Sequence, residues 1–278
     1  MVWRKFSKKD LEETKNKFES EGYTYQWLAM ASEVIILTLG RDWFWKYVGK
    51  ENHNETYFWP KKEGKLDGDE HNSRVTKLGD MLYALKDYEG YEYFIDSLKK
   101  RNLQSTIFEL QTAHLFHMNG HSIKFIEESK EKMKDYDLQA TIDGIIINVE
   151  AKSKRASSIL NERRLEKTLK NAQKQLPKID SNVIFVEIPE DWSKKDNSRT
   201  LIEKCIKNFF KDFSHIHKIF ILFQTWKKIN GENCHLVALY EYNNKTIKNP
   251  VLEEKILATS NVPKDITPEN QDYKPSFL

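Results

Sequence analysis

The fold is decided by a stretch near the middle of the chain: Asp137-Leu138-Gln139-Ala140-Thr141-Ile142-Asp143-Gly144-Ile145-Ile146-Ile147-Asn148-Val149-Glu150-Ala151-Lys152. Asp143 and Gly144 separate two runs of β-prone residues, and both residue types tolerate the positive φ angles of a two-residue hairpin turn. The stretch therefore predicts a β-hairpin in which Ile142 pairs with Ile145. Counting outward from that pair places Asp137 directly across from Glu150.

The two faces of this hairpin differ in chemistry because side chains alternate along a strand. One face is apolar and carries Leu138, Ala140, Ile142, Ile145, Ile147, Val149 and Ala151. The other face is mostly polar and carries Asp137, Gln139, Thr141, Ile146, Asn148, Glu150 and Lys152. Like charges directly opposite one another destabilise a sheet, and a divalent cation held between the two acids would compensate for this.

The same residue types suit metal-assisted hydrolysis of a phosphodiester. Such chemistry needs oxygen ligands that hold Mg²⁺ or Mn²⁺ and leave positions for water and phosphate. Asp137, Glu150 and the backbone carbonyl of Ala151 would supply these ligands. Lys152, one pleat beyond Glu150, would orient the attacking water, whose pKa a bound metal lowers.

Bulk composition limits the classes of protein that this chain can belong to. Over 278 residues, 39% are apolar and 31% are charged, which is typical of a globular protein with an ample core. The formal net charge of +3 gives no global basic field, so nucleic-acid binding would need a local patch. Two cysteines, Cys205 and Cys234, argue against a disulfide framework. Without a signal peptide or an apolar run of about 20 residues, we expect a cytoplasmic protein outside the membrane.

Helical spacing of apolar residues dominates the first region, residues 1–100. Helices are expected over residues 25–39, 78–86 and 91–98, and a polar, glycine-containing loop over residues 61–73. The sequence assigns no role to this α-helical region.

Residues 101–258 show alternating helix and strand patterns. We expect helices over residues 105–118, 159–176 and 199–213, and strands over residues 121–126, 182–188, 216–223 and 235–242 around the hairpin. The order is helix, three strands, helix, strand, helix, two strands. This order predicts an α/β core with a mixed central sheet flanked by helices. Residues 259–278, which contain three prolines, are expected to form an irregular tail.

Asp137 together with Glu150-Ala151-Lys152 resembles the signature of the PD-(D/E)XK nucleases, the restriction-endonuclease-like superfamily. The element order over residues 103–242 resembles their core. Four other Glu-x-Lys sequences in the chain lie on no comparable strand, which favours this one. The resemblance implies a Mg²⁺- or Mn²⁺-dependent endonuclease that hydrolyses phosphodiester bonds, most simply in DNA.

Further site residues follow from the resemblance. Family members often add a glutamate from the helix before the first strand, and Glu109 holds that position. Many also carry a glutamine on the helix after the lysine strand, where Gln173 fits and Gln175 is the rival. Tyr136 stands where the signature often has proline, which leaves Asp135 as an alternative acid, placed across from Lys152.

Basic residues follow the lysine strand. The candidates for phosphate contact are Lys154, Arg155, Arg163, Lys167, Lys170 and Lys174, and Arg164 lies among them. Glu162 and Glu166 interrupt this set, so a solvated charged face is the alternative. We expect DNA as the partner, with RNA as the second choice and a homodimer left open. The rival function is a catalytically degenerate nuclease-fold module that binds nucleic acid or a protein partner.

Overall fold

A computed structural model describes residues 9, 12–16, 26–49, 57–58, 61–62, 65–66, 68–129, 135–154, 161–178, 181–189, 192, 197–229 and 232–246. Its centre is a six-stranded sheet. The strands are β3 (Ser122–Phe125), β4 (Leu138–Ile142), β5 (Ile145–Ser153), β6 (Ser181–Glu187), β7 (Ile216–Ile229) and β8 (Glu232–Asn243), in that spatial order. The sheet is mixed, because β5, β6 and β7 run parallel and the remaining neighbours run antiparallel.

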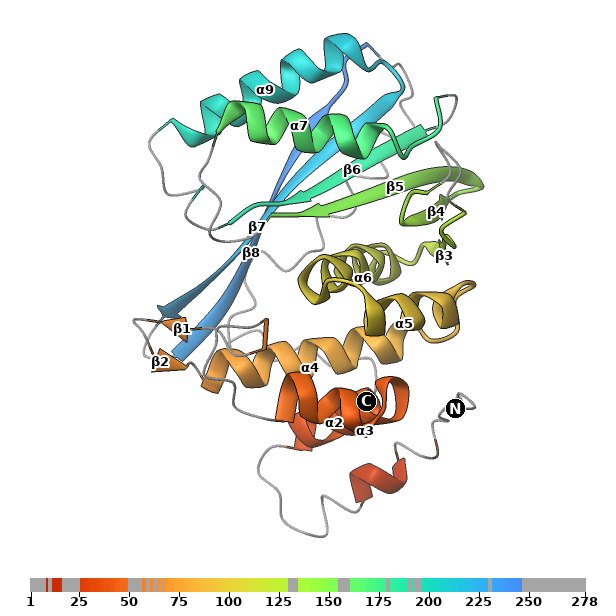
Figure 1. Cartoon of the computed structure of the whole chain (residues 1–278), viewed down its shortest axis with the longest axis vertical. Coiled ribbons are helices and arrows are strands. Elements are labelled where there is room, and N and C mark those ends of the chain that lie inside the picture. The colour runs from red at the N-terminus through yellow and green to blue at the C-terminus, as the bar shows by residue number, and fades with distance from the viewer. Residues whose placement is uncertain are drawn as a thin grey trace.

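Helices cover both faces of this sheet (Figure 1). One face carries α7 (Glu162–Gln173) and α9 (Ser198–Asp212), and the other carries α6 (Leu103–Met118). The remaining elements are α2 (Gln26–Leu39), α3 (Arg41–Phe44), the π-helix η1 (Trp45–Gly49), α4 (Gly68–Leu85), α5 (Tyr91–Lys100) and a short pair of strands, β1 (Lys61–Lys62) and β2 (Lys65–Leu66). The α/β class, the mixed sheet and the expected order of elements after residue 101 are therefore confirmed.

The hairpin has the expected turn and register. Asp143 and Gly144 have φ angles of +46° and +81°, as a turn with two left-handed residues requires. Ile142 pairs with Ile145, and the ladder ends at the pair of Leu138 with Val149. Asp137 thus lies one residue before β4 rather than inside the ladder.

A row of side-chain amides crosses the sheet near the open end of the hairpin. Gln139 donates to the side-chain oxygen of Asn148 at 3.1 Å, and Asn148 donates to that of Asn182 at 3.2 Å. These residues are direct partners on β4, β5 and β6. The row satisfies polar groups that α7 and α9 would otherwise bury without partners.

Two hydrophobic clusters lie on the two faces of the sheet. The cluster beneath α7 and α9 includes Leu169 and Ile184. The other extends from α2, through α4, α5 and α6, to β3, β4 and β5, and includes Leu78 and Phe185. The N-terminal helices and the sheet therefore share one apolar core.

Helix α4 begins earlier than the sequence suggests. A loop was expected over residues 61–73, but α4 starts at Gly68. Its first turns hold a buried glutamate, Glu70, which forms an ion pair with Arg74 one turn later. Tertiary packing of the helix therefore outweighs the weak helix propensity of this polar stretch. The expected tail over residues 259–278 lies outside the described residues.

Candidate active site

The carboxylate of Asp137 replaces a backbone group at the end of the hairpin ladder. Its Oδ2 accepts a hydrogen bond of 2.7 Å from the backbone N–H of Ala151, which would otherwise bond to residue 136 if the ladder continued. The N–H and C=O of a residue in an antiparallel ladder point to the same side. The carbonyl of Ala151 therefore faces the side on which Asp137 lies.

Glu150 is a central-strand carboxylate with no exposed surface. Its Oε1 forms an ion pair with the ammonium of Lys152, whose side chain is 28% exposed. Among the described residues, Oε2 of Glu150 is buried and has no hydrogen-bond partner. A buried carboxylate oxygen without a partner is costly, so this atom marks a position where a ligand would stabilise the protein.

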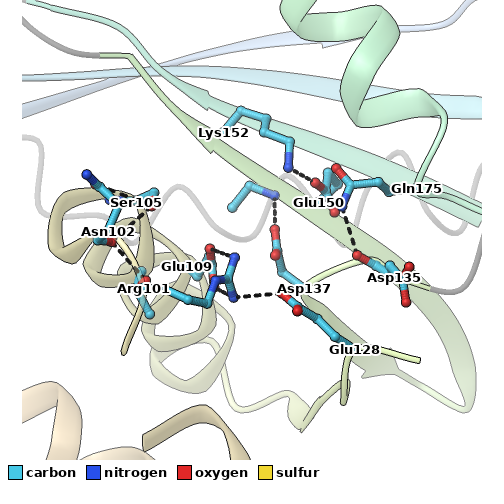
Figure 2. Close-up of polar contacts among 12 residues, drawn as sticks. Arg101, Asn102, Ser105, Glu109, Glu128, Asp135, Asp137, Glu150, Lys152 and Gln175 are labelled. Carbon is cyan, nitrogen blue, oxygen red and sulfur yellow. Dashed lines mark hydrogen bonds and ion pairs between the residues drawn. The ribbon is translucent and has the colours of Figure 1, made fainter. Parts of the chain in front are cut away.

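Glu109 approaches the same region from α6. It is 4% exposed, and both of its oxygens accept hydrogen bonds from the guanidinium of Arg101, at 3.0 and 3.2 Å. Arg101 follows α5 directly and also lies 3.5 Å from an oxygen of Glu128. Figure 2 shows Asp137 between this group and the pair formed by Glu150 and Lys152.

The three acids are close enough to influence one another's titration. Burial, followed by the charge of Asp137, raises the pKa of both Glu109 and Glu150 well above the ordinary value. Burial also raises the pKa of Asp137, although Lys152 and Arg101 oppose this. Burial lowers the pKa of Lys152, but the neighbouring carboxylates, Glu150 first, outweigh it and leave that pKa raised. The positively charged side chains nearby therefore do not fully compensate the negative charges of these three acids.

A small pocket opens at this cluster. Its wall includes the charged residues Arg101, Glu109, Glu128, Asp135 and Asp137, together with Gln175. Glu150 and Lys152 lie on β5, outside this wall. The pocket thus reaches two of the three acids that the sequence singles out.

Of the two candidate glutamines, the structure brings Gln175 to the pocket. Its amide donates to the backbone carbonyl of Asp135 at 3.0 Å, two residues before Asp137. Gln173 is the last residue of α7 and contacts the ring of His215 at 3.2 Å. The side chain of Asp135 accepts hydrogen bonds from Ser129, and Lys152 pairs with Glu150 instead of with Asp135.

The basic candidates do not form a single positively charged face. Burial and the charges of Lys152, Arg164 and Lys167 lower the pKa of Lys154, so these cations lie near one another beside the lysine strand. The ammonium of Lys170 instead pairs with Glu166 at 2.6 Å. Two further candidates, Arg163 on α7 and Lys174 directly after it, are exposed. Arg155 lies outside the described residues.

The sequence analysis missed Arg101 and Glu128. Both contact the acidic group only because the end of α5 and the segment after β3 converge on α6. No motif signals this, although Asn102 was recognisable as the N-cap of α6, where it accepts a hydrogen bond from Ser105 at 3.2 Å.

The donor set fits a hard divalent cation in chemistry and burial. Three carboxylates and a backbone carbonyl are the ligands that Mg²⁺ and Mn²⁺ prefer. The unpartnered Oε2 of Glu150 supports this fit. The geometry is not that of a closed metal site, since the described residues contain no group of three or more His, Cys, Asp or Glu side chains arranged to hold an ion.

Comparison with known proteins gives no family for this chain: no family description matches it, and neither does any curated protein. Within the part of the chain that the structure describes, no helix is long and apolar enough to cross a membrane.

Proposed function

We propose that this protein is a metal-dependent nuclease of the PD-(D/E)XK type, which hydrolyses phosphodiester bonds, with DNA as its substrate. The observation that carries the proposal is the meeting of Asp137, Glu150 and Lys152 at the open end of one hairpin, with Glu109 beside them. The proposal is also supported by the α6-β3-β4-β5-α7-β6 order, which resembles the core of that superfamily.

Charge balance supports a metal at this site. Glu109, Asp137 and Glu150 bring three negative charges when ionised, and Arg101 and Lys152 bring two positive ones. A dication would relieve the repulsion that raises the pKa of these buried acids. When bound, it would polarise the phosphate and acidify a bound water.

The residues of the chain would then divide the remaining tasks. Asp137, Glu150, Glu109 and the carbonyl of Ala151 would hold Mg²⁺ or Mn²⁺. Lys152 would orient the attacking water, and Gln175 would hold the segment that carries Asp137. Lys154, Arg164 and Lys167 would contact phosphates that flank the cleaved bond.

The test is cleavage of plasmid and linear DNA, and of RNA, by the full chain with Mg²⁺ or Mn²⁺. We expect wild type to cleave, and Asp137→Asn, Glu150→Gln and Lys152→Met to lose activity by about 10²-fold or more. Glu70→Gln is the matched control, because Glu70 is also a buried, ion-paired glutamate but lies on α4. Wild-type cleavage no greater than that of Asp137→Asn and Lys152→Met would refute the proposal.

A second candidate function is a nuclease-fold module that binds nucleic acid or a protein partner without catalysis. It is favoured by one observation: each acid already has a partner, Arg101 for Glu109, the Ala151 N–H for Asp137 and Lys152 for Glu150. Calorimetric titration with Mn²⁺ separates the two functions. Binding that Glu150→Gln abolishes supports the nuclease, and no binding supports the module.

A further inference from the structure

Arg101 forms direct contacts with the candidate metal site, and the proposed function assigns it no role. Its guanidinium donates to both oxygens of Glu109, at 3.0 and 3.2 Å, and lies 3.5 Å from Glu128. Its charge also acts on Asp137. The side chain is 37% exposed and lines the pocket, whereas that of Glu109 is 6% exposed.

This contact conflicts with the role assigned to Glu109 in the proposed function. Both oxygens of Glu109 accept hydrogen bonds from the guanidinium, so a metal that takes Glu109 as a ligand competes with Arg101 for these oxygens and repels its positive charge. The backbone of Arg101 is fixed, because its N–H bonds to Ser97 at 2.8 Å at the end of α5. Movement is therefore confined to the side chain, which stays at the pocket.

A guanidinium displaced from a carboxylate keeps its charge and its paired donors. The same planar donor geometry matches the oxygens of a phosphate. A phosphate bound beside the metal ligands would be the nearest new acceptor in the pocket, while Glu128, which is 55% exposed, is a weak solvent-screened partner.

We propose that Arg101 is the counter-ion of Glu109 in the metal-free protein and binds the scissile phosphate once a metal has taken its place. This inference rests on the proposed function, because it assumes a metal and a phosphate at this site. It adds a substrate-binding residue that also sets how tightly the metal binds. Arg101 thereby makes metal binding and phosphate binding depend on one another.

The experiment measures Mn²⁺ affinity by calorimetry on the full chain without nucleic acid, and then DNA cleavage at saturating Mn²⁺. Arg101→Gln should bind Mn²⁺ about threefold to tenfold more tightly than wild type, because a competing cation is gone. Its cleavage rate should nevertheless fall about 10²-fold. Tighter metal with slower cleavage is a combination that a purely structural role does not produce.

Two further variants control for an effect of misfolding on the measured Mn²⁺ affinity. Arg101→Lys keeps the charge but loses the paired donors, so its Mn²⁺ affinity should lie between those of wild type and Arg101→Gln. Arg74→Gln removes an arginine from another buried glutamate, Glu70, and should leave Mn²⁺ affinity unchanged.

The outcomes separate this inference from the proposed function. If Glu150→Gln abolishes Mn²⁺ binding but Arg101→Gln and Arg101→Lys bind as wild type does, the role of Arg101 is wrong and the metal site stands. Unchanged cleavage by Arg101→Gln likewise overturns the phosphate contact. If neither wild type nor Arg101→Gln binds Mn²⁺, both proposals fall together.

Discussion

At the scale of single residues, the site combines acids that the folded protein accommodates poorly. Glu150 has no exposed surface, and its Oε2 is without a hydrogen bond among the described residues. Lys152 offsets its charge only in part, since the pKa of Glu150 stays well above the ordinary value. Such a loss of stability is common at positions where function, rather than stability, determines which residue is present.

Replacing Glu150 with its neutral isostere should therefore stabilise the metal-free protein. An acid whose pKa is raised by folding contributes stability below its ordinary pKa of 4.5, and this is lost as the pH rises through the folded pKa. In EDTA, Glu150→Gln should resemble wild type near pH 4.5 and be more stable by about 1–2 kcal/mol at neutral pH. Urea unfolding at several pH values measures this difference.

Glu187 provides the control for this prediction. It is a half-buried acid, but Ser153 and Gln224 donate hydrogen bonds to its two oxygens. Burial raises the pKa of Glu187 as well, but Glu187→Gln replaces one acceptor by a donor and costs a hydrogen bond, so it should stabilise the protein less than Glu150→Gln does. Equal stabilisation of both variants would show that the effect is not specific to the site.

At the scale of elements, α2 and α4 cross at a point without room for a side chain. A Cβ on Gly79 would lie 2.6 Å from the Cα and the Cβ of Ala31. Gly79 is in the middle of α4, so glycine is required here for the close packing of the two helices and not for a special backbone conformation. This crossing supports the face of α4 that packs on α6, which carries Glu109.

Gly79→Ala should therefore destabilise the protein, by about 1–3 kcal/mol, because the two helices must separate. Helix propensity alone predicts the opposite sign, since alanine is about 1 kcal/mol better than glycine within a helix. Gly68→Ala, at the start of the same helix, has no atom within 4 Å of the new Cβ and should be neutral or stabilising. Thermal unfolding of both variants measures these changes in stability. Stabilisation by Gly79→Ala would mean that the two helices have room for the added methyl group.

At the scale of the whole molecule, the N-terminal helices are built into the core beneath the sheet. One apolar cluster joins α2 and α4 to β3, β4 and β5, and a second lies beneath α7 and α9. The central sheet belongs to both clusters. Unfolding of one part should therefore remove the support of the other.

We expect cooperative unfolding that a pair of core variants can test. Leu78, on α4, and Leu169, on α7, are both fully buried, one in each cluster. Leu78→Ala and Leu169→Ala should each lower the free energy of unfolding by about 2–5 kcal/mol. Circular dichroism and tryptophan fluorescence should follow one shared transition in both proteins. A separate early transition in Leu78→Ala alone would show that the N-terminal helices unfold independently.

Local signals were enough to predict the hairpin. Asp143-Gly144 specifies the turn, the turn fixes the register, and the register places Asp137 near Glu150. Contacts between distant segments could not be predicted in this way. Arg101 reaches Glu109 only through the junction of α5 with α6, which no local pattern encodes.

The two glutamines illustrate a second limit. Gln173 and Gln175 are two positions apart, and on a helix this spacing points them in very different directions. Because α7 ends at Gln173, Gln175 belongs to the turn that follows, and its orientation depends on where the helix stops. Helix ends are the least certain part of a sequence-based prediction.

The amide row formed by Gln139, Asn148 and Asn182 also bears on misfolding. A slip of β5 against β6 by two residues would keep every apolar side chain on its proper face, so hydrophobic patterning does not oppose it. The slip would, however, part Asn148 from Asn182 and leave a buried N–H donor of Asn148 and the buried Oδ1 of Asn182 without each other, at about 1–3 kcal/mol for each unmet group. These three uncharged side chains thus disfavour a two-residue misalignment of the strands that the apolar residues would tolerate.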